Sequence, residues 1–354
     1  MKKILLFLFL LFVFISNCYA STSSAYEYVL MDAVTGRVLS GKNYNTSALI
    51  ASITKIMTCV LAIESNKLDN IVVVDDTVLK AYGSGIYITV GEELTLRDLL
   101  YGLMLRSGND AALMVAKYVG GDIDNFVSMM NNKANDIGMK NTIFINPSGL
   151  DDDGGNYSSA YDMAILTRYA MKYLEYREIV STKKYTLKTN KNTYIWKNKN
   201  KLLSEDYITG GKTGYTDKAR RTLVSTGSKD NMDLIVVTIR DSDDWNIHKS
   251  LYNMAFKKYK AYKFLDKNNF NITGNNFYKG SFYIKNDVYI PVLEDELSNI
   301  SGKVILDIID NYKTGDRVGY YEISLDKNIL YKEDIYIKKS GKKSKSSWFR
   351  ELFS

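Results

Sequence analysis

Histidine is nearly absent from this chain of 354 residues, which contains only His248. A Ser-His-Asp triad therefore has one candidate base, and a metal site built from several histidines is excluded. The two cysteines, Cys18 and Cys59, are too few for a disulfide framework or a four-thiolate zinc site. If the protein is a hydrolase, we expect its chemistry to depend on Ser, Lys, Asp, Glu or Tyr side chains.

A strong charge of either sign is also lacking. The 47 Lys and Arg against 40 Asp and Glu give a formal net charge of +7. This excess is too small and too widely spread to predict nucleic-acid binding. The hydrophobic content of 45% is that of an ordinary folded protein, and the length favours two domains over one.

Residues 1–20 have the pattern of a signal peptide. Two lysines precede the unbroken apolar stretch Ile4–Ile15, and small residues follow at the two positions that a signal peptidase reads. The stretch is too short to span a membrane comfortably, and it lacks the polar face of a buried amphipathic helix. Acylation of Cys18 is an alternative, although Asn17 is a poor residue before a lipoprotein cysteine. We therefore expect export and a mature chain that begins at Ser21.

The next part of the chain predicts an α+β domain over residues 21–263. Strand patterns occupy Tyr26–Leu39, with a turn at Thr35-Gly36, and then Arg221–Thr226 and Leu234–Arg240. Helical periodicity predicts helices over Ser52–Glu64, Leu96–Val119, Asp124–Ile137, Ser159–Tyr173 and Asp244–Tyr262. Because strands lie at both ends and helices between them, we expect an antiparallel sheet completed by both ends of the domain and flanked by helices.

The last part of the chain has a different sequence pattern. Short alternating runs separated by turn residues predict a small all-β domain over residues 264–337. Residues 338–354 form a basic tail with an aromatic tip, Trp348-Phe349. Such a tail is compatible with peripheral binding to the outer face of a membrane and equally with a solvated tail.

Ser52 and Lys55 form an S-x-x-K motif at the start of a predicted helix. The spacing of three residues places both side chains on one face, with the amine in reach of the hydroxyl. A lysine that titrates near ~10.4 must be desolvated or placed beside another cation before it can act as a base. Taken alone, the motif is weak, because a Ser cap followed by a solvated Lys is common.

Ser107-Gly108-Asn109 interrupts two apolar helical runs. The glycine allows a tight link that directs Ser107 and Asn109 into a cleft. A plain turn between helices uses the same residue types, so this motif is also weak by itself.

Lys212-Thr213-Gly214 follows two glycines and fits an edge strand along which a substrate backbone can lie. Lys212 and Thr213 are suited to bind a carboxylate, and we expect Lys212 to help lower the pKa of Lys55. A phosphate-binding P-loop is excluded, because Asp206 stands where that motif needs its first glycine and no helical pattern follows.

The three motifs, in this order and in an exported chain, resemble the signature set of penicillin-binding proteins and class A β-lactamases. The surrounding sequence is similar to the D-alanyl-D-alanine carboxypeptidases, the low-molecular-mass penicillin-binding proteins of peptidase family S11. The likeness covers about Tyr26 to Tyr262 and continues more weakly beyond. It rests on the segments YVLMDAVTGRVL (28–39), ASITKIMT (51–58), GEELTLRDLLYGLMLRSGNDAA (91–112), IGMKNTIFINPSGLD (137–151) and GKTGYT (211–216).

This resemblance implies the penicillin-binding-protein/β-lactamase-like serine transpeptidase fold and a serine acyl-enzyme mechanism. The implied catalytic residues are Ser52, Lys55, Ser107 and Asn109, and the implied substrate-binding residues are Lys212, Thr213, Gly214 and Tyr215. Ser52 attacks the bond between the last two D-alanines of a peptidoglycan stem peptide, Lys55 takes its proton, and water later hydrolyses the acyl-enzyme. The backbone N–H groups of Ser52 and Tyr215 form the implied oxyanion hole.

The resemblance further implies β-lactam antibiotics as covalent inhibitors, no metal or organic cofactor, no nucleic-acid partner, and a location in the cell wall or on the outer face of the cytoplasmic membrane. A carboxylate-binding arginine known in some members has Arg240 as its candidate here. His248 is expected to lie on a helix surface or to pack, and Cys59 to pack in the core. Rival functions are a β-lactamase, which the glycine of Ser-Gly-Asn disfavours, and a non-catalytic penicillin-binding protein, which the intact motifs disfavour.

Overall fold

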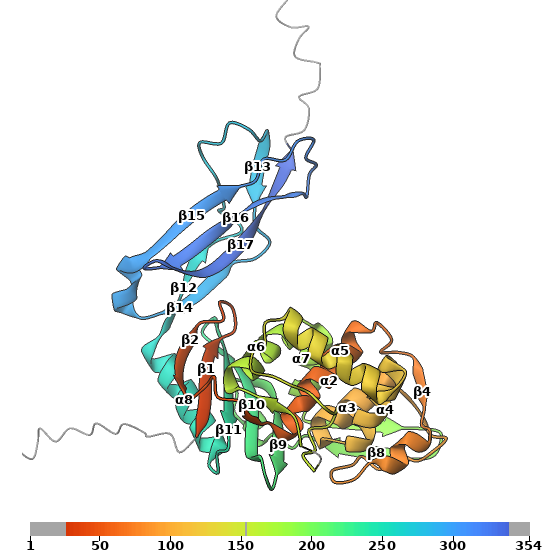
Figure 1. The fold of residues 1–354 in the computed structure, drawn as a ribbon. Coiled ribbons are helices and arrows are strands. Elements are labelled where there is room, and N and C mark those ends of the chain that lie inside the picture. Colours follow the sequence, from red (N-terminus) through yellow and green to blue (C-terminus); the bar gives the residue numbers. More distant parts are fainter. Residues whose placement is uncertain (1–25, 153, 340–354) are drawn as a thin grey trace, which may run out of the picture.

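The computed structural model describes residues 26–152 and 154–339. They form a larger unit of sheet and helices, from which a narrower β domain projects (Figure 1). The predicted signal peptide and the part of the basic tail from residue 340 onward lie outside the described residues. The predicted α+β class, with a C-terminal all-β domain, is confirmed.

A five-stranded antiparallel sheet organises the larger unit, in the order β2-β1-β11-β10-β9. Its strands are β1 (Glu27–Asp32), β2 (Val38–Lys42), β9 (Ile208–Thr216), β10 (Arg220–Lys229) and β11 (Met232–Ile239). The central strand β11 is buried along nearly its whole length because it contacts two helices, α6 (Ala160–Ala170) and α8 (Asp244–Lys258). Both ends of the domain therefore build one sheet, as predicted.

Seven α-helices pack on or beside this sheet within the described residues. They are α2 (Lys55–Glu64), α3 (Leu96–Tyr101), α4 (Asn109–Gly120), α5 (Ile123–Asp136), α6 (Ala160–Ala170), α7 (Leu174–Ser181) and α8 (Asp244–Lys258). Helix α2 is the central one, and its residues from Lys55 to Ile63 are all buried. Side-chain caps start several helices: Thr95 forms a capping box with Asp98 before α3, and Ser159 caps α6.

The predicted long helix from Leu96 to Val119 is broken in the middle. A π-helical turn, η3 (Gly102–Arg106), follows α3, and Ser107 then adopts a left-handed backbone conformation with φ 65° before α4 begins. The break lies at the Ser-Gly-Asn motif, where the sequence suggested a tight link.

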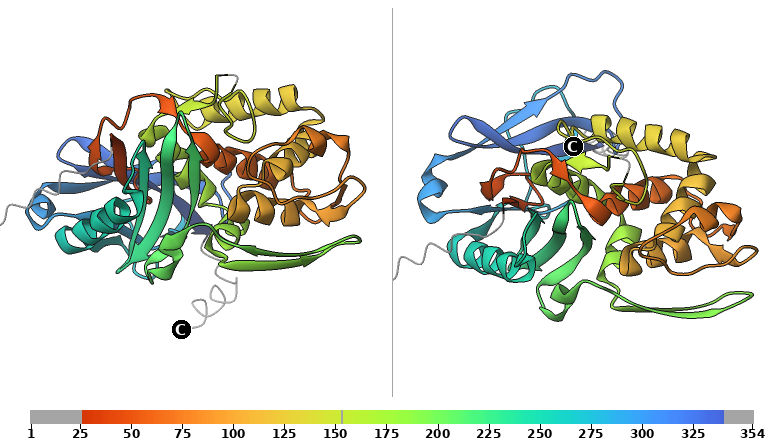
Figure 2. Two further views of the ribbon diagram at one scale, coloured as in Figure 1. Left: turned by 90° about the horizontal axis from the view of Figure 1, so that it is seen from below. Right: turned by 60° about the horizontal axis from the view of Figure 1, so that its bottom comes forward.

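Short elements complete the larger unit. The 3-10 helices η1 (Ala51–Thr54), η2 (Asp76–Lys80) and η4 (Lys201–Ser204) accompany the strand pairs β3 (Ala48–Leu49) with β6 (Tyr157–Ser158), and β4 (Ile71–Val73) with β5 (Glu93–Thr95). The hairpin of β7 (Lys184–Lys188) and β8 (Thr193–Lys197) forms an arm beside the helical side of the unit (Figure 2). Neither this hairpin nor helix α7 was predicted from the sequence.

The predicted extension of the helix to Tyr262 is wrong. Helix α8 ends at Lys258, because Tyr259 adopts an extended conformation. The chain continues as β12 (Lys260–Leu265), which pairs with β14 (Val288–Val292). The aromatic residues at 259–262 fit the periodicity of a helix as well as that of a strand. Pairing with a distant segment decides that this stretch is a strand.

The C-terminal domain contains a four-stranded antiparallel sheet in the order β13-β17-β16-β15. Its strands are β13 (Gly280–Tyr283), β15 (Ile300–Leu306), β16 (Arg317–Leu325) and β17 (Asn328–Lys339), with η5 (Glu294–Asn299) before β15. Lys338 and Lys339, assigned to the basic tail from the sequence, are thus the end of a strand. The domain has its own hydrophobic core, and an ion pair between Arg37 and Glu296 joins it to the larger unit.

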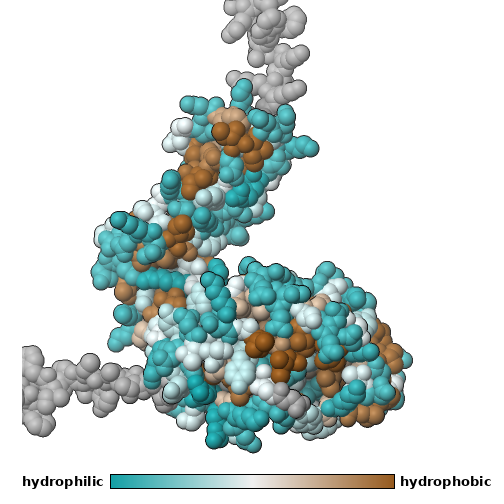
Figure 3. All heavy atoms as spheres, in the orientation of Figure 1, coloured by the Kyte–Doolittle hydropathy of each residue, from teal (hydrophilic) through white to brown (hydrophobic). Residues whose placement is uncertain are grey.

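The face of the molecule seen in Figure 3 is largely hydrophilic, with an apolar patch on the larger unit and smaller groups along the β domain. Within residues 26–152 and 154–339, no helix has the length and apolar character needed to cross a membrane.

Candidate active site

The first wall of the site is formed by η1 and the start of helix α2: Ser52 lies in η1, and Lys55 is the first residue of α2. Lys55 Nζ donates to Ser52 Oγ at 3.1 Å, as the three-residue spacing predicted. The backbone before this helix is tightly fitted: Ala51 has φ 48°, and a Cβ added to Gly149 would lie 1.9 Å from the carbonyl oxygen of Ala51. Gly149 itself has φ +87°, so glycine is required there for two reasons.

Lys55 is fully buried and makes three hydrogen bonds. Besides Ser52, its Nζ donates to Asn109 Oδ1 at 2.7 Å and to the carbonyl oxygen of Ser148 at 2.6 Å. Burial, followed by the positive charge of Lys199, lowers the pKa of Lys55 to about 7 against the opposing charge of Asp110. A substantial fraction of this amine is therefore unprotonated at neutral pH and competent to accept the Ser52 proton.

The second wall is the turn between η3 and α4. It presents Ser107 and Asn109, both buried, toward the two lysines of the site. Asn109 Nδ2 donates to the carbonyl oxygen of Tyr82 at 2.7 Å, which fixes the orientation of the amide. Asp110 anchors the loop on the outer side by accepting the backbone N–H groups of Ile86 and Tyr87.

The third wall is β9, which is the end strand of the large sheet, as predicted for the Lys-Thr-Gly motif. Lys212 is 1% exposed, and its Nζ donates to Ser107 Oγ at 3.0 Å and to the carbonyl oxygen of Thr213 at 2.7 Å. Burial, followed by the charges of Lys55 and Lys199, holds the pKa of Lys212 well below its usual range. Lys212 thus bridges the second and third walls.

Gly214 lies directly against the start of the nucleophile helix. A Cβ at this position would lie 2.9 Å from Ser52 N and 2.4 Å from Thr222 Oγ1. The neighbouring Tyr215 is 57% exposed, and its hydroxyl donates to Asp217. The absence of a side chain at Gly214 allows the backbone of β9 to approach the Ser52 N–H, which is the arrangement that a two-donor oxyanion site needs.

The structure therefore brings the predicted residues of all three motifs together. Hydrogen bonds connect Ser52, Lys55 and Asn109 on one side and Ser107 and Lys212 on the other. A serine hydroxyl, a neutral buried amine beside it and backbone donors opposite are the components of an acyl-transfer site. In the described part of the chain, no group of three or more His, Cys, Asp or Glu side chains could hold a metal ion.

The sequence analysis missed some members of the site. Lys199 is the cation that contributes to the low pKa of Lys55, a role expected of Lys212. The carbonyl of Ser148 and the carboxylate of Asp110 also belong to the network. The sequence carried one weak signal for Ser148, because it lies in the segment Ile137–Asp151 that carries the resemblance.

The predicted packing role of His248 is confirmed. Its ring is fully buried between Ser225 Oγ, 2.6 Å from Nδ1, and Thr238 Oγ1, 3.0 Å from Nε2. Burial lowers the pKa of His248 to about 3, so the ring is neutral under most conditions. Cys59 is fully buried in the core, as expected, and burial raises the pKa of its thiol.

Arg240 does not join the site. Its guanidinium forms an ion pair with Glu27 and stacks on the ring of Tyr26. Arg221, which is opposite Tyr215 in the strand pairing, is held by Asp244. The suggested carboxylate-binding role of Arg240 is therefore wrong.

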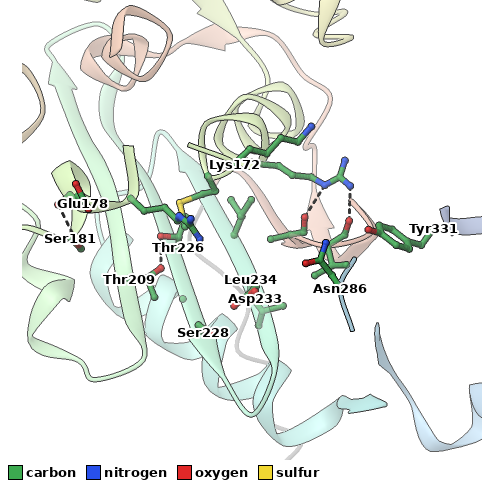
Figure 4. Close-up of a pocket in the computed structure, with 17 residues that line it drawn as sticks. Lys172, Glu178, Ser181, Thr209, Thr226, Ser228, Asp233, Leu234, Asn286 and Tyr331 are labelled. Atoms are coloured by element: carbon green, nitrogen blue, oxygen red, sulfur yellow. Dashed lines mark hydrogen bonds between the residues drawn. The ribbon is translucent and has the colours of Figure 1, made fainter. Parts of the chain in front are cut away.

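A large cavity lies away from the nucleophile (Figure 4). It has a volume of about 990 Å³ and lies between α6, α7, the β9–β11 end of the sheet and the C-terminal domain. Arg168 spans one side by donating to the carbonyl oxygens of Ala33 and Val34, and Asn286 and Tyr331 line the side of the β domain. None of the residues of the three motifs lines this cavity.

Comparison with family models gives two matches. Residues 16–243 match the model described as "D-alanyl-D-alanine carboxypeptidase", and residues 259–343 match "Penicillin-binding protein 5, C-terminal domain". The chain is similar to the D-alanyl-D-alanine carboxypeptidase DacF of Bacillus subtilis, with 35% identity over 250 residues, and to DacA of Haemophilus influenzae, with 30% identity over 318 residues. These alignments cover 68% and 83% of this chain, and 64% and 76% of the relatives.

Comparison with solved structures finds proteins of the same kind. Penicillin-binding protein 5 from Haemophilus influenzae superposes with a TM-score of 0.72 at 27% identity, covering 92% of this chain and 99% of the other. Penicillin-binding protein 6B from Escherichia coli gives 0.66 at 28% identity, covering 88% and 94%. A mutant of the Streptomyces K15 DD-transpeptidase gives 0.60 at 32% identity, covering 66% and 99%.

Proposed function

Because the chain belongs to the family of D-alanyl-D-alanine carboxypeptidases, we propose that it is a serine-type D-Ala-D-Ala carboxypeptidase of bacterial cell-wall maturation. Its substrates are peptidoglycan stem pentapeptides, from which it removes the terminal D-alanine. One observation carries the proposal: the fully buried Lys55 amine lies within hydrogen-bond distance of both Ser52 Oγ and Asn109 Oδ1. A base with a lowered pKa at the nucleophile is what acylation of a serine requires.

In the acylation step, Ser52 Oγ attacks the carbonyl carbon of the penultimate D-alanine while its proton passes to Lys55 Nζ. The negative charge that develops on the carbonyl oxygen is stabilised by the N–H groups of Ser52 and Tyr215. Each donor of this kind contributes about 3–4 kcal/mol in other serine enzymes. The C–N bond then breaks, and the departing amine receives a proton through the Lys55, Ser107 and Lys212 network.

In the deacylation step, a water molecule replaces the departed D-alanine. Lys55 accepts a proton from this water, and the hydroxyl oxygen attacks the ester carbonyl. Collapse of the second tetrahedral intermediate releases the shortened peptide and returns a proton to Ser52 Oγ. Asn109 holds the substrate amide throughout both steps. During acylation, Thr213 with Lys212 binds the terminal carboxylate of the D-alanine that then departs.

The open edge of β9 receives the substrate as an extended chain. Gly210, Gly211 and Gly214 leave this strand without bulky side chains near the nucleophile. Backbone pairing at a sheet edge aligns a peptide without reading many of its side chains. This geometry is suited to a substrate that is recognised by its backbone and its terminal carboxylate.

The proposal extends to location and inhibitors. Residues 1–20 direct export, so that the mature enzyme works in the cell wall or at the outer face of the cytoplasmic membrane. β-Lactam antibiotics acylate Ser52, because they present a carbonyl and a carboxylate in the same relation as the D-Ala-D-Ala terminus. Peripheral membrane contact through residues 340–354 is tested by co-sedimentation with anionic vesicles; unchanged partitioning after deletion of these residues contradicts it.

The test is D-alanine release from a short peptide ending in Lys-D-Ala-D-Ala by the chain from Ser21 to Ser354. We expect release that disappears in Ser52→Ala and persists in Ser65→Ala, a serine whose hydroxyl donates to the carbonyl of Ala62 away from the site. Covalent labelling by a fluorescent penicillin without D-alanine release would instead indicate a non-catalytic binding protein. Rapid release of the penicilloyl group would indicate a β-lactamase.

A further inference from the structure

Lys199 belongs to none of the three motifs, yet the fold fixes it beside all of them. Its backbone N–H donates to the carbonyl of Leu105 at 3.1 Å, two residues before Ser107. The next residue, Asn200, donates from its side chain to the carbonyl of Gly210 at 3.3 Å, two residues before Lys212. The Lys199 backbone is thus held between the second wall of the site and the strand that forms the third.

The side chain of Lys199 reaches Ser84, a residue that is hydrogen-bonded to the Ser107-Gly108-Asn109 turn. Its Nζ donates to Ser84 Oγ at 3.3 Å, and the carbonyl of Ser84 accepts the backbone N–H of Asn109 at 2.7 Å. The residue is exposed, unlike Lys55 and Lys212. An ammonium has three protons to donate, and one long bond to a hydroxyl leaves the group available for an anion entering from solvent.

The charges around this ammonium are mostly positive. Arg106 lies close enough to lower the pKa of Lys199, after burial as the larger cause, and Lys199 acts in the same direction on Lys55 and Lys212. Asp110 is the acid beside the site, and its carboxylate already accepts the backbone N–H groups of Ile86, Tyr87 and Ala111. Among the ion pairs of the described residues, none includes Lys199.

Two arginines of the neighbouring strands, Arg240 and Arg221, do not compete for the same ligand. Arg240 is bound to Glu27, and Arg221 is bound to Asp244 and lies over the Trp245 ring. The end of the cleft where Ser107 meets Lys212 therefore offers an exposed lysine, Lys199, as a cation for a ligand.

We propose that Lys199 is a substrate-recognition residue, whose ammonium binds the terminal carboxylate of the acyl donor beside Lys212 and Thr213. The inference rests on the proposed carboxypeptidase function. A carboxylate at this point bonds to a cation that has no carboxylate partner in the described structure, and it relieves the repulsion among Lys199, Lys55 and Lys212. A substrate without this carboxylate gains neither effect.

The test compares Lys199→Met, Lys199→Arg and the control Lys201→Met, an exposed lysine of η4. Two peptides are used: one with a free D-Ala-D-Ala carboxylate and one with a terminal amide. For Lys199→Met we expect at least a tenfold loss of kcat/KM on the acid, mainly through KM, because a charge-assisted hydrogen bond is lost. The amide should change less than about threefold, so that the preference for the acid falls.

Lys199→Arg should restore most of the preference for the acid, and Lys201→Met should match the wild type. An acid-to-amide preference that stays at the wild-type value in Lys199→Met, in protein that still binds penicillin stoichiometrically, overturns the assignment. A proportional loss on both peptides also overturns it, since that pattern indicates a structural role.

The two proposals fail in distinguishable ways. If the wild type releases no D-alanine, the carboxypeptidase function fails, and Lys199 is then judged by acylation of Ser52 with benzylpenicillin and with its methyl ester. A tenfold loss in Lys199→Met confined to the free acid supports carboxylate recognition. Equal rates of wild type and variant on the free acid contradict it.

Discussion

The larger unit and the C-terminal domain differ in what they bury. The larger unit encloses many polar side chains, among them Lys55, Lys212, Asn109 and His248, whereas among the described residues of the β domain the only buried charged or polar side chain is Glu333. Both regions have hydrophobic cores made of aliphatic and aromatic residues. Because burying polar groups opposes folding unless they are paired, a concentration of them marks the region that carries chemistry.

The two regions also differ in how their stability depends on pH. The β domain depends on apolar packing and strand pairing, which change little with pH. The larger unit holds two lysines and a histidine whose pKa values burial lowers, so that protonation works against its native state. Activity and pH sensitivity should therefore both belong to the larger unit.

The largest expected effect comes from removing the base. Lys55→Met should lower D-alanine release and penicillin acylation at least about 1,000-fold, because catalytic groups that act as a unit fail together. The second-order rate of labelling by a fluorescent penicillin measures this. A variant that retains a tenth of the wild-type rate at pH 7 would show that another group takes the Ser52 proton.

The wild-type pH profile should report the same amine. Lys55 acts in its neutral form and has a pKa of about 7, so acylation should fall about tenfold for each pH unit below that value and level off above it. Acylation rates between pH 5 and 9 give the profile. An inflection near pH 10 would indicate a lysine with an ordinary pKa and would contradict the electrostatic argument.

Gly214→Ala should have the next largest effect. The new Cβ lies against Ser52 N and Thr222 Oγ1, so β9 must move away from the nucleophile and the oxyanion donors separate. We expect acylation to fall about 100-fold, the usual consequence of losing one such donor. Thermal unfolding provides the control, because a variant that melts far below the wild type would show that the change damages folding instead of the site.

His248→Gln tests the pH argument directly. The unfolded chain takes up a proton on His248 below about pH 6.5, while the native ring stays neutral down to about pH 3, so the wild type loses stability as the pH falls through this window. At about 1.4 kcal/mol per pH unit, the loss due to this ring reaches about 3 kcal/mol at pH 4. Urea unfolding at pH 7 and pH 4 measures the decrease in the free energy of unfolding, which should be smaller in the variant by that amount. Equal decreases would show that His248 does not contribute to the pH dependence.

The smallest expected effect concerns the junction of the two regions. Glu296→Gln weakens the partly buried ion pair with Arg37, whose side chains are 18% and 20% exposed. We expect the free energy of unfolding to fall by about 1 kcal/mol or less, and kcat/KM to stay within twofold of the wild type. A larger loss of activity would mean that the C-terminal domain influences the site, and the contrast between the two regions would fail.

The parts of the site that were predictable are short-range in sequence. Ser52 and Lys55 are one helical turn apart, and the Lys-Thr-Gly strand has a glycine-rich pattern of its own. That these motifs lie close together in space was predicted from the family resemblance alone, because no local sequence pattern indicates that Lys212 contacts Ser107. The sheet was predictable because β1 and β11 contain long apolar runs.

The parts that were missed depend on tertiary contacts. Lys199 lies in a lysine- and asparagine-rich segment that reads as surface loop, and its position comes from bonds to the distant backbone of Leu105. The strands of the β7–β8 hairpin do alternate, as in KYTLK, but each is only five residues long and mostly exposed, so the signal is short. The end of α8 was wrong because pairing of β12 with β14 overrides the helical pattern.

An unpaired sheet edge also bears on solubility. Strand β9 ends the large sheet with backbone groups that can pair with any extended chain, including a second copy of the protein. Its glycines offer little apolar surface to a second copy, and Lys212 points into the site. The edge proposed to receive the substrate thus offers little for self-association, and a saturating β-lactam that occupies it should slow aggregation further.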